Sequence, residues 1–532
     1  MTINLIILLL ILRIIINNLI PGKTNKNREI SLGLSIIILY VYLGELLKYN
    51  SNNNEFQGRI EIFGYPFGLD GIGISLLGLI MLLDPILILL IKGEREEGIE
   101  RKRILNYLLL IQLFLIILFS CLDILIFFIT FELILIPMFL LITRYGSKYQ
   151  YFLPRLEAGI RFFMFTMIGS LLIFLGIAIL YIKYGTTSNE LLNIYINETI
   201  NSNSKSSIEY FNSINILQIV WIFFFFSFFI KIPMFPFHTW LPLAHSDAPT
   251  IGSIILAAIL LKLASFGILR YSLYLFQPLT LPTLSREVFT TIPSNLDNSI
   301  LLFIENEPIY NIFLPILYIL ALISIIYCSF IPLRGIFDFK KIIAYSSIIH
   351  MNFSIFGFFS KDLIGLTGSS LLMFTHAFIS SALFLLIGII YKRYHSRFLP
   401  YFQGLSFTMP LFTFFFIFFS LANISLPFCS SFLSEFFILV SSMHINPFIS
   451  FLLALSLIIS SSFVIWLANR LLFGQPSSYL FPIVNLNKVG GSIDLSLTEF
   501  LTLMPFFLFT FFLTFFPQFL ISLLTLPLTL FI

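Results

Sequence analysis

Four charged residues lie in segments that otherwise have the composition of membrane-spanning helices. They are Glu132, Lys231, Lys262 and Glu435. A charge at the centre of a bilayer costs roughly 2.5–3.5 kcal/mol on insertion scales, so four unpaired charges would cost about 10 kcal/mol. The cost falls when such groups face one another or water. The pattern therefore predicts an internal path for an ion.

The rest of the chain has the composition of a polytopic membrane protein. Of its 532 residues 58% are hydrophobic and 11% are charged, and the mean hydropathy is +1.00. Such a chain cannot hide its apolar surface in a water-soluble core. The apolar runs predict an all-α fold of about 14 transmembrane helices in a single integral membrane domain over residues 1–532. The helices are expected near 2–20, 31–47, 72–92, 105–120, 122–142, 160–184, 214–240, 249–276, 311–331, 336–359, 364–391, 409–440, 447–473 and 500–530.

Two of these helices, the seventh and the twelfth, are expected to be broken. The seventh contains Pro233 two residues after Lys231, and the twelfth contains Pro427 eight residues before Glu435. A proline in mid-membrane frees backbone carbonyls, which is tolerated where the backbone is buried in protein or lines a cavity. Broken helices five elements apart are typical of inverted repeats.

We expect the first five-helix repeat over 104–276 and the second over 311–473, followed by a C-terminal helix over 500–530. Two stretches between helices read as loops. Residues 186–213 are rich in Asn and Ser, which predicts a polar, solvent-exposed loop, and residues 277–299 form an irregular stretch with several prolines.

The basic residues of the loops indicate an orientation. Roughly nineteen Lys and Arg are expected on one side of the membrane and about seven on the other, with both termini on the less basic side. Sixty-six Phe with only 27 Gly is typical of an AT-rich organellar gene. The first apolar span lacks the character of a transit peptide. In a mitochondrion, the basic loops would lie in the matrix and both termini would face the intermembrane space.

The sequence has no pattern for a redox cofactor, a metal or nucleic acid. Cys121, Cys328 and Cys429 are far apart in apolar surroundings, without the spacing of a zinc or iron–sulfur site. The stretch Gly71–Gly73 resembles a dinucleotide fingerprint but has Leu76 where the third glycine belongs. No basic run carries interleaved aromatic residues, which argues against nucleic acid as a partner.

Several motifs occur in order along most of the chain and carry a family resemblance. They are FELILIPM at 131–138, KIPMFPFHTWLPLAH at 231–245, DAP at 247–249, GSIILA at 252–257 leading to LKL at 261–263, and FDFKKIIAYSSIIHM at 337–351. Together they resemble the antiporter-like proton-channel subunits of respiratory complex I. The resemblance implies proton translocation across the mitochondrial inner membrane, coupled to electron transfer from NADH to ubiquinone. It implies flanking antiporter-like subunits and membrane lipids as partners, with NAD, FMN, iron–sulfur clusters and ubiquinone held by other subunits.

The resemblance also implies roles for the four charges. Glu132 matches the glutamate of the fifth helix, Lys231 the lysine of the broken seventh, Lys262 the lysine of the eighth, and Glu435 the glutamate of the twelfth. A lysine removed from water holds its proton less tightly, and a nearby carboxylate restores the affinity. Forming or breaking a Glu132–Lys231 pair would therefore switch the lysine between holding and releasing a proton. The structural alternative is a buried ion pair that only fixes helix register.

Histidines and one further carboxylate leave alternatives open. His350 and His376 lie near paired serines on the tenth and eleventh helices, where a proton relay and an ordinary buried histidine are both possible. For His238 and His245, beside the first break, a structural hydrogen bond is the preferred interpretation. Asp84, next to Pro85 in the third helix, is interpreted as marking a kink near the surface rather than a channel group.

Two other functions remain as alternatives to a complex I subunit. A stand-alone multi-subunit cation/proton antiporter would need the same kinds of charge, although the Phe-rich composition and the fuller match to the mitochondrial motifs argue against it. A purely structural scaffold within the complex would tolerate neutral residues in place of the buried lysines.

Overall fold

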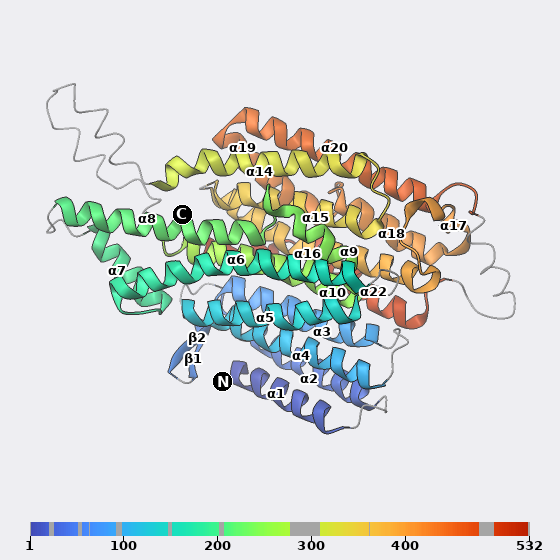
Figure 1. Ribbon diagram of the computed structural model, residues 1–532, viewed down its shortest axis with the longest axis horizontal. Helices are drawn as coiled ribbons and strands as arrows, with labels where there is room; N and C mark the ends of the chain where they lie inside the picture. The colour runs from blue at the N-terminus through green and yellow to red at the C-terminus, as the bar shows by residue number, and fades with distance from the viewer. Residues whose placement is uncertain are drawn as a thin grey trace.

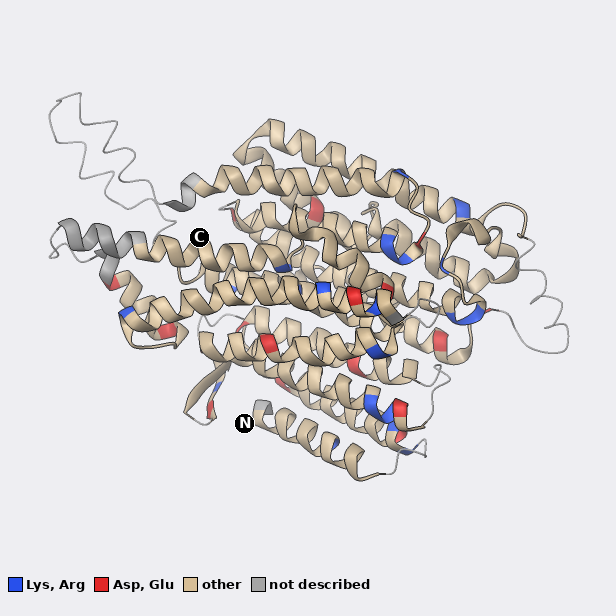
Figure 2. Ribbon diagram, in the orientation of Figure 1, with Lys and Arg blue, Asp and Glu red and all other residues tan. Residues whose placement is uncertain are grey.

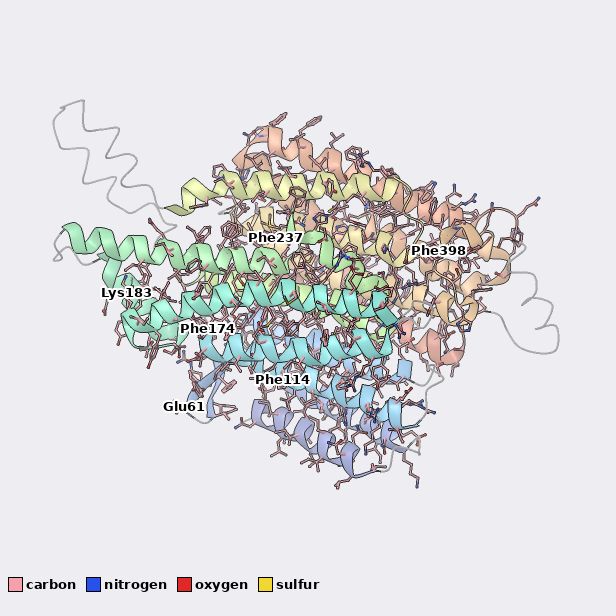
Figure 3. The ribbon with its side chains drawn as sticks, in the orientation of Figure 1. Glu61, Phe114, Phe174, Lys183, Phe237 and Phe398 are labelled. Atoms are coloured by element: carbon pink, nitrogen blue, oxygen red, sulfur yellow. The ribbon has the colours of Figure 1, made fainter. Side chains whose placement is uncertain are left out.

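The computed structural model describes residues 2–20, 26–51, 56–62, 64–91, 98–146, 152–201, 207–276, 309–360, 362–477 and 494–529. Within these ranges, ten helices are long and apolar enough to cross a membrane, and four shorter apolar helices accompany them. The helices lie side by side with their long axes nearly parallel (Figure 1), and side chains fill the space between them (Figure 3). The predicted all-α polytopic membrane fold is confirmed, whereas the helix count of about 14 and the two inverted repeats stay predictions.

The N-terminal part of the chain contains helices and one short hairpin. Its elements are α1 (Thr2–Leu19), α2 (Lys26–Lys48), β1 (Gln57–Ile62), β2 (Tyr65–Leu69) and α3 (Gly71–Ile91). The strands are antiparallel, with Ile62 opposite Tyr65, and Gly64 between them has a φ of 81°, which favours glycine. Sequence analysis missed this hairpin. The alternation of polar and apolar residues from Arg59 to Ile62 could have indicated its first strand.

The middle of the chain contains the first broken helix. Its elements are α4 (Gly98–Ser120), α5 (Ile124–Tyr145), α6 (Phe152–Tyr184), α7 (Asn189–Asn201), α8 (Ser207–Lys231), η1 (Phe237–Thr239), α9 (Trp240–Asp247), α10 (Thr250–Ile255), η2 (Leu256–Leu260), α11 (Leu261–Gly267) and η3 (Ile268–Leu273). The predicted break is confirmed, because α8 ends at Lys231 and regular structure resumes at Phe237.

The prediction of a loop over 186–213 is wrong for much of that range, because α7 lies inside it and α8 begins before its end. Leu192 and Ile196 are four residues apart and both buried, so a helix places them on one packed face. This apolar spacing outweighs the Asn-rich composition on which the loop prediction depended. The predicted loop over 277–299 lies outside the described residues.

The C-terminal half contains the second broken helix. Its elements are α14 (Ile309–Leu333), α15 (Phe339–Phe358), α16 (Leu363–Tyr394), η6 (Leu399–Tyr401), α17 (Leu405–Thr408), α18 (Pro410–Asn423), α19 (Ser430–Ile445), α20 (Pro447–Leu472), α22 (Leu497–Phe515) and α23 (Gln518–Thr529). The break between α18 and α19 is confirmed, and Ser425 and Phe428 within it have φ values of 62° and 72°. The single helix expected over 500–530 is wrong in detail, because the chain breaks between α22 and α23 at Pro517, which cannot continue a helical hydrogen-bond ladder.

The two ends of the bundle differ. The strands β1 and β2 and helix α7 lie at one end, called here the hairpin end, and α17 lies at the other, called the α17 end (Figure 1). Charged residues are sparse along the helices, and Lys and Arg gather toward the α17 end (Figure 2). This is the distribution that the positive-inside rule describes for the two faces of a membrane protein.

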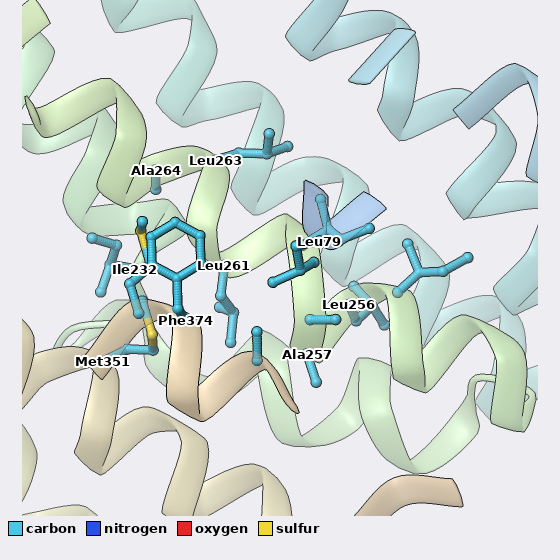
Figure 4. Packing of buried hydrophobic residues seen from close by; sticks show 14 of the residues in the cluster. Leu79, Ile232, Leu256, Ala257, Leu261, Leu263, Ala264, Met351 and Phe374 are labelled. Carbon is cyan, nitrogen blue, oxygen red and sulfur yellow. The ribbon is translucent and has the colours of Figure 1, made fainter. Parts of the chain in front are cut away.

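Two elements form the centre of the bundle. In the apolar central stretch of helix α16, 100% of the residues are buried, and in that of the segment Thr250–Leu273, 94% are buried. The corresponding share in α2 is only 22%. Leu261 of α11 lies close to Ile232, Met351 and Phe374 in this core, and Leu263 lies on the other side of the helix (Figure 4). A polar side chain in the central part of either element is therefore enclosed by protein and not by lipid.

Candidate functional site

Lys231 lies at the first helix break with an unusual set of neighbours. It is the last residue of α8 and is 5% exposed, and its Nζ lies 2.9 Å from the centroid of the Phe131 ring on α5. A cation over an aromatic face gains electrostatic energy from the ring quadrupole. The next residue on α5 is Glu132, which acts on Lys231 electrostatically. Within the described residues, neither Lys231 Nζ nor Glu132 Oε1 has a hydrogen-bond partner, so both groups are held close without a direct bond.

Lys262 occupies the centre of the bundle between two π-helical segments. Helix α11 carries it, with η2 before and η3 after, and the side chain is 0% exposed. Wide helical turns of this kind are common at functional sites because they disturb the regular backbone ladder. Lys262 Nζ donates to the Ala257 carbonyl at 2.6 Å and lies 2.8 Å from His376 Nδ1 on α16.

Two histidines extend this contact to Glu435. The rings of His376 on α16 and His350 on α15 have their centroids 5.6 Å apart. His350 Nδ1 in turn lies 2.9 Å from Glu435 Oε1 on α19, an ion-pair contact whose angles are not those of a hydrogen bond. All three side chains are at most 5% exposed. Four titratable groups from four helical elements therefore form one buried series, Lys262–His376–His350–Glu435.

The six candidate residues thus fall into two groups. Glu132 and Lys231 form one, and the buried series from Lys262 to Glu435 forms the other. In the part of the chain that the structure describes, no ion pair or hydrogen bond joins the two groups.

The structural hydrogen bond predicted for His245 is wrong within the described residues, because both ring nitrogens lack a partner there. The ring is held by stacking, with its centroid 4.5 Å from that of Phe384 and an interplanar angle of 2°. For His238, Nδ1 likewise has no partner among the described residues, and the ring stacks beside Phe235 at 6.0 Å. For His245, stacking on Phe384, which sequence spacing does not reveal, takes the place of the expected hydrogen bond.

Lys340 is a buried cation that sequence analysis did not single out. It is 2% exposed, and its Nζ donates to the Ala248 carbonyl at 2.7 Å and to Ser253 Oγ at 3.1 Å. Asp338 was the sequence signal for the start of this helix. Its carboxylate accepts the Lys340 backbone N–H as a helix N-cap, so Lys340 lies in the first turn of α15. Lys340 and Lys262 both act electrostatically on His245.

The interpretation of Asp84 as a surface kink is wrong. Asp84 is 7% exposed, and its carboxylate accepts from Arg13 of α1 at 2.5 and 3.3 Å. Arg13 is 1% exposed and also reaches Gln112 Oε1 of α4 at 3.4 Å. A buried carboxylate needs such a partner, because desolvation of an unpaired charge is expensive. The lone arginine in the apolar first helix was the signal that sequence analysis missed.

The chain matches a known family over most of the bundle. The family model described as NADH:quinone oxidoreductase/Mrp antiporter, TM, matches residues 121–292 and 298–461. The chain belongs to this family. These residues include all six candidate side chains, whereas Arg13 and Asp84 lie outside the match.

Members of the NADH:quinone oxidoreductase/Mrp antiporter family from several eukaryotes resemble the chain along most of its length. NADH-ubiquinone oxidoreductase chain 4 of Chondrus crispus is 37% identical and covers 92% of this chain and 88% of its own. The protein of the same name from Marchantia polymorpha is 37% identical over 91% and 89%. That from Wickerhamomyces canadensis is 33% identical over 98% and 97%.

Solved structures share the fold of this family member. A chain of respiratory complex I from Thermus thermophilus with bound NADH has a TM-score of 0.77 at 22% identity and covers 99% of both chains. A chain of the archaeal membrane-bound sulfane sulfur reductase has a TM-score of 0.77 at 15% identity, covering 99% of this chain and 96% of the other. At these identities the likeness concerns the fold alone.

Proposed function

We propose that this chain is a core membrane subunit of respiratory complex I, the NADH:ubiquinone oxidoreductase. In this role it moves protons across the mitochondrial inner membrane while NADH reduces ubiquinone in other subunits. The chain is then part of an enzyme but carries out no redox step itself. The observation that carries the proposal is the buried series Lys262–His376–His350–Glu435, enclosed at the centre of a membrane-spanning bundle. Family membership supports the same conclusion.

The first step is a switch at Lys231. A buried lysine binds its proton more tightly when a carboxylate is close, and Glu132 is near enough to Lys231 to act on it electrostatically. A small movement of the broken α8 relative to α5 changes the distance between the two groups. Because no direct hydrogen bond fixes Lys231 Nζ within the described residues, such a movement alters its contact with the Phe131 ring but breaks no hydrogen bond of the ammonium.

The second step passes a proton from Lys262 to His376. When the lysine is charged, one N–H is donated to the Ala257 carbonyl and a second points to His376 Nδ1, so a neutral His376 carries its proton on Nε2. Within the described residues Nε2 has no hydrogen-bond partner. His376 accepts a proton at Nδ1 and then releases the other from Nε2, which advances one positive charge along the series.

The third step brings the proton to Glu435 through His350. Imidazoles bind and release protons near neutral pH, which suits them to this position. His350 Nδ1 lies 2.9 Å from Glu435 Oε1, and a turn of the imidazole that aligns the two atoms lets the histidine deliver its proton to the carboxylate. Glu435 is then the last group of the series before the outlet.

The surroundings of the chain follow from the same proposal. Flanking antiporter-like subunits and lipids cover its exposed apolar faces, and NAD, FMN, iron–sulfur clusters and ubiquinone are held by other subunits. The concentration of Lys and Arg at the α17 end supports placing that end in the matrix and both termini toward the intermembrane space (Figure 2). The two breaks, after Lys231 and before Ser430, support the inverted repeats over 104–276 and 311–473.

The family name also includes Mrp antiporters, so a stand-alone multi-subunit cation/proton antiporter is the second candidate. Mild detergent extraction followed by a native gel distinguishes the two. Co-migration of the chain with NADH-oxidising activity in a large complex excludes the antiporter. Migration apart from that activity excludes the complex I subunit.

The proposed proton path is tested with Lys231→Met in the intact complex, reconstituted into vesicles. Methionine keeps the length of the side chain and removes the charge. We expect normal assembly on a native gel with a collapse of proton pumping and of coupled NADH oxidation. Lys48→Met, at the exposed end of α2, is the matched control and should pump normally. Wild-type pumping in Lys231→Met contradicts a role in the path and leaves the buried charge a structural one.

A further inference from the structure

An exposed histidine–carboxylate pair joins the helix that carries Glu435 to the start of α16. His444 Nδ1, in the last turn of α19, is 2.9 Å from Asp362 Oδ2, at the start of α16. The two side chains are 62% and 36% exposed. The function proposed above makes no use of them, and His444 is the exposed titratable group of α19 nearest in sequence to Glu435 among the described residues.

The pair lies at the hairpin end of the bundle. Helix α16 has 32 residues and spans about 48 Å at 1.5 Å per residue. Its far end carries Arg393, whose guanidinium contacts Met409 next to α17. Asp362, at its start, is therefore at the opposite face from the buried Lys340 and from the basic residues of the α17 end. A proton that reaches Asp362 and His444 has crossed to the face opposite the basic one.

Buried hydroxyl groups lie between Glu435 and this pair. Ser442 follows Glu435 by seven residues, which is two helical turns and therefore the same face of α19, and it is 0% exposed. Its neighbour Ser441 is also 0% exposed. The whole distance from Glu435 to His444 is nine residues, or about 13 Å along the helix.

The hydroxyl groups continue from α19 to Asp362. A Cβ placed on Gly365 of α16 would lie 2.7 Å from Ser441 Oγ and would collide with Ser360 Oγ, so both hydroxyls border this glycine. Ser360 Oγ accepts the backbone N–H of Asp362 at 3.4 Å. Gly365 thus leaves room for these two hydroxyls between α19 and the Asp362 carboxylate. They lie at the interface between α16 and α19, which pack extensively against each other.

We propose that the Asp362–His444 pair is the group through which protons leaving Glu435 reach water at the hairpin end. The inference rests on the proton path proposed above and adds its outlet. A histidine held by a carboxylate and open to water takes a proton from the buried hydroxyls and passes it to solvent. The other titratable group facing Asp362 within the described residues is Tyr318 of α14, whose hydroxyl donates to the Phe359 carbonyl at 2.6 Å.

The decisive variant is His444→Arg. Arginine keeps a positive partner for Asp362 but does not release its proton at physiological pH, so it preserves an ion pair and removes proton transfer. We expect complex I carrying this variant to assemble normally and to pump several-fold more slowly in vesicles. If the pair only held α16 against α19, arginine would serve this purpose equally well and pumping would be normal. Wild-type pumping in His444→Arg therefore overturns the proposal.

A second measurement tests whether an imidazole is the missing group. In His444→Gln, vesicles loaded on the outlet side with a membrane-impermeant histidyl dipeptide should regain much of the lost rate of potential formation. A loss of pumping in an assembled complex that the dipeptide does not restore also overturns the proposal. His395→Asn, at the other end of α16, is the control, because asparagine tolerates the left-handed φ of 56° there.

Parallel measurements on Lys231→Met separate this inference from the function on which it rests. If Lys231→Met abolishes pumping while His444→Arg pumps as the wild type does, only the outlet is wrong. If Lys231→Met pumps normally, the proton path itself is wrong.

Discussion

Lys262 and His376 are 114 positions apart in the sequence, and their side-chain nitrogens lie 2.8 Å apart at the centre of the bundle. The lysine comes from a helix interrupted by π-helical turns and the histidine from the most enclosed helix of the chain. The contact links the first half of the bundle to His350 and Glu435 in the second half. A proton on Lys262 therefore has a direct acceptor across the interface between the two halves.

Replacing His376 with glutamine tests the relay at this contact. Glutamine offers Lys262 a carbonyl acceptor, so the buried ammonium keeps a partner, but an amide does not carry a proton onward. We expect normal assembly and a loss of pumping at least at the lower end of the roughly 10²–10⁴-fold range for a general acid–base group. The measurement is the rate of potential formation in vesicles. A His376→Gln complex that pumps at the wild-type rate shows that the histidine is no relay.

The Arg13–Asp84 pair is expected to stabilise the attachment of α1 to α3. Asp84→Leu leaves Arg13 buried without its charge partner and should cost about 3–5 kcal/mol, seen as a lower thermal midpoint or poor assembly. The double variant Arg13→Leu/Asp84→Leu replaces both charges with apolar groups and should recover most of this loss. A double variant no more stable than Asp84→Leu alone would falsify the assignment of the pair as a neutralising contact.

Arg270 is expected to be a second buried anchor, between η3 and the start of α3. Its Nη2 lies 2.7 Å from Asp70 Oδ1, and its Nη1 donates to the carbonyls of Phe119 and Cys121. Arg270→Leu leaves all three acceptors without this partner and should cost about 3–5 kcal/mol of stability. Arg59→Leu, which breaks the exposed pair with Glu190, should cost about 0–1 kcal/mol. Similar thermal midpoints for the two variants would contradict this difference in burial.

Gly71 is expected to determine how closely α23 approaches α3. A Cβ there would collide with the backbone carbonyl of Leu523 and lie 3.0 Å from Pro527 Cγ. Gly71→Ala should therefore push α23 away and cost about 1–3 kcal/mol, because a backbone group cannot rotate aside. Gly33→Ala in α2 meets nothing within 4 Å and should be neutral or stabilising. Thermal unfolding of the detergent-solubilised complex measures both, and an unchanged midpoint for Gly71→Ala counts against the close approach.

Much of the helical fold was predictable from the sequence because membrane helices leave a strong local signal. Runs of apolar residues gave most of the helices, and Pro233 and Pro427 gave both breaks. Helix α7 was missed because its Asn-rich composition hid the spacing of Leu192 and Ile196. The hairpin was missed because short strands have a weak pattern, and Asp84 was misread because its partner lies 71 positions away.

The sequence by itself determined that the charges at Glu132, Lys231, Lys262 and Glu435 must face the interior of a membrane protein, because a charge in contact with hydrocarbon has a high free-energy cost. It also singled out His350 and His376 without saying what they contact. Only the tertiary structure decided that Lys262 meets His376, that His350 meets Glu435 and that Arg13 neutralises Asp84. Hydrophobicity and helical period are local properties of a chain, whereas the pairing of buried polar groups depends on which helix faces pack together, and that is set by the whole bundle at once.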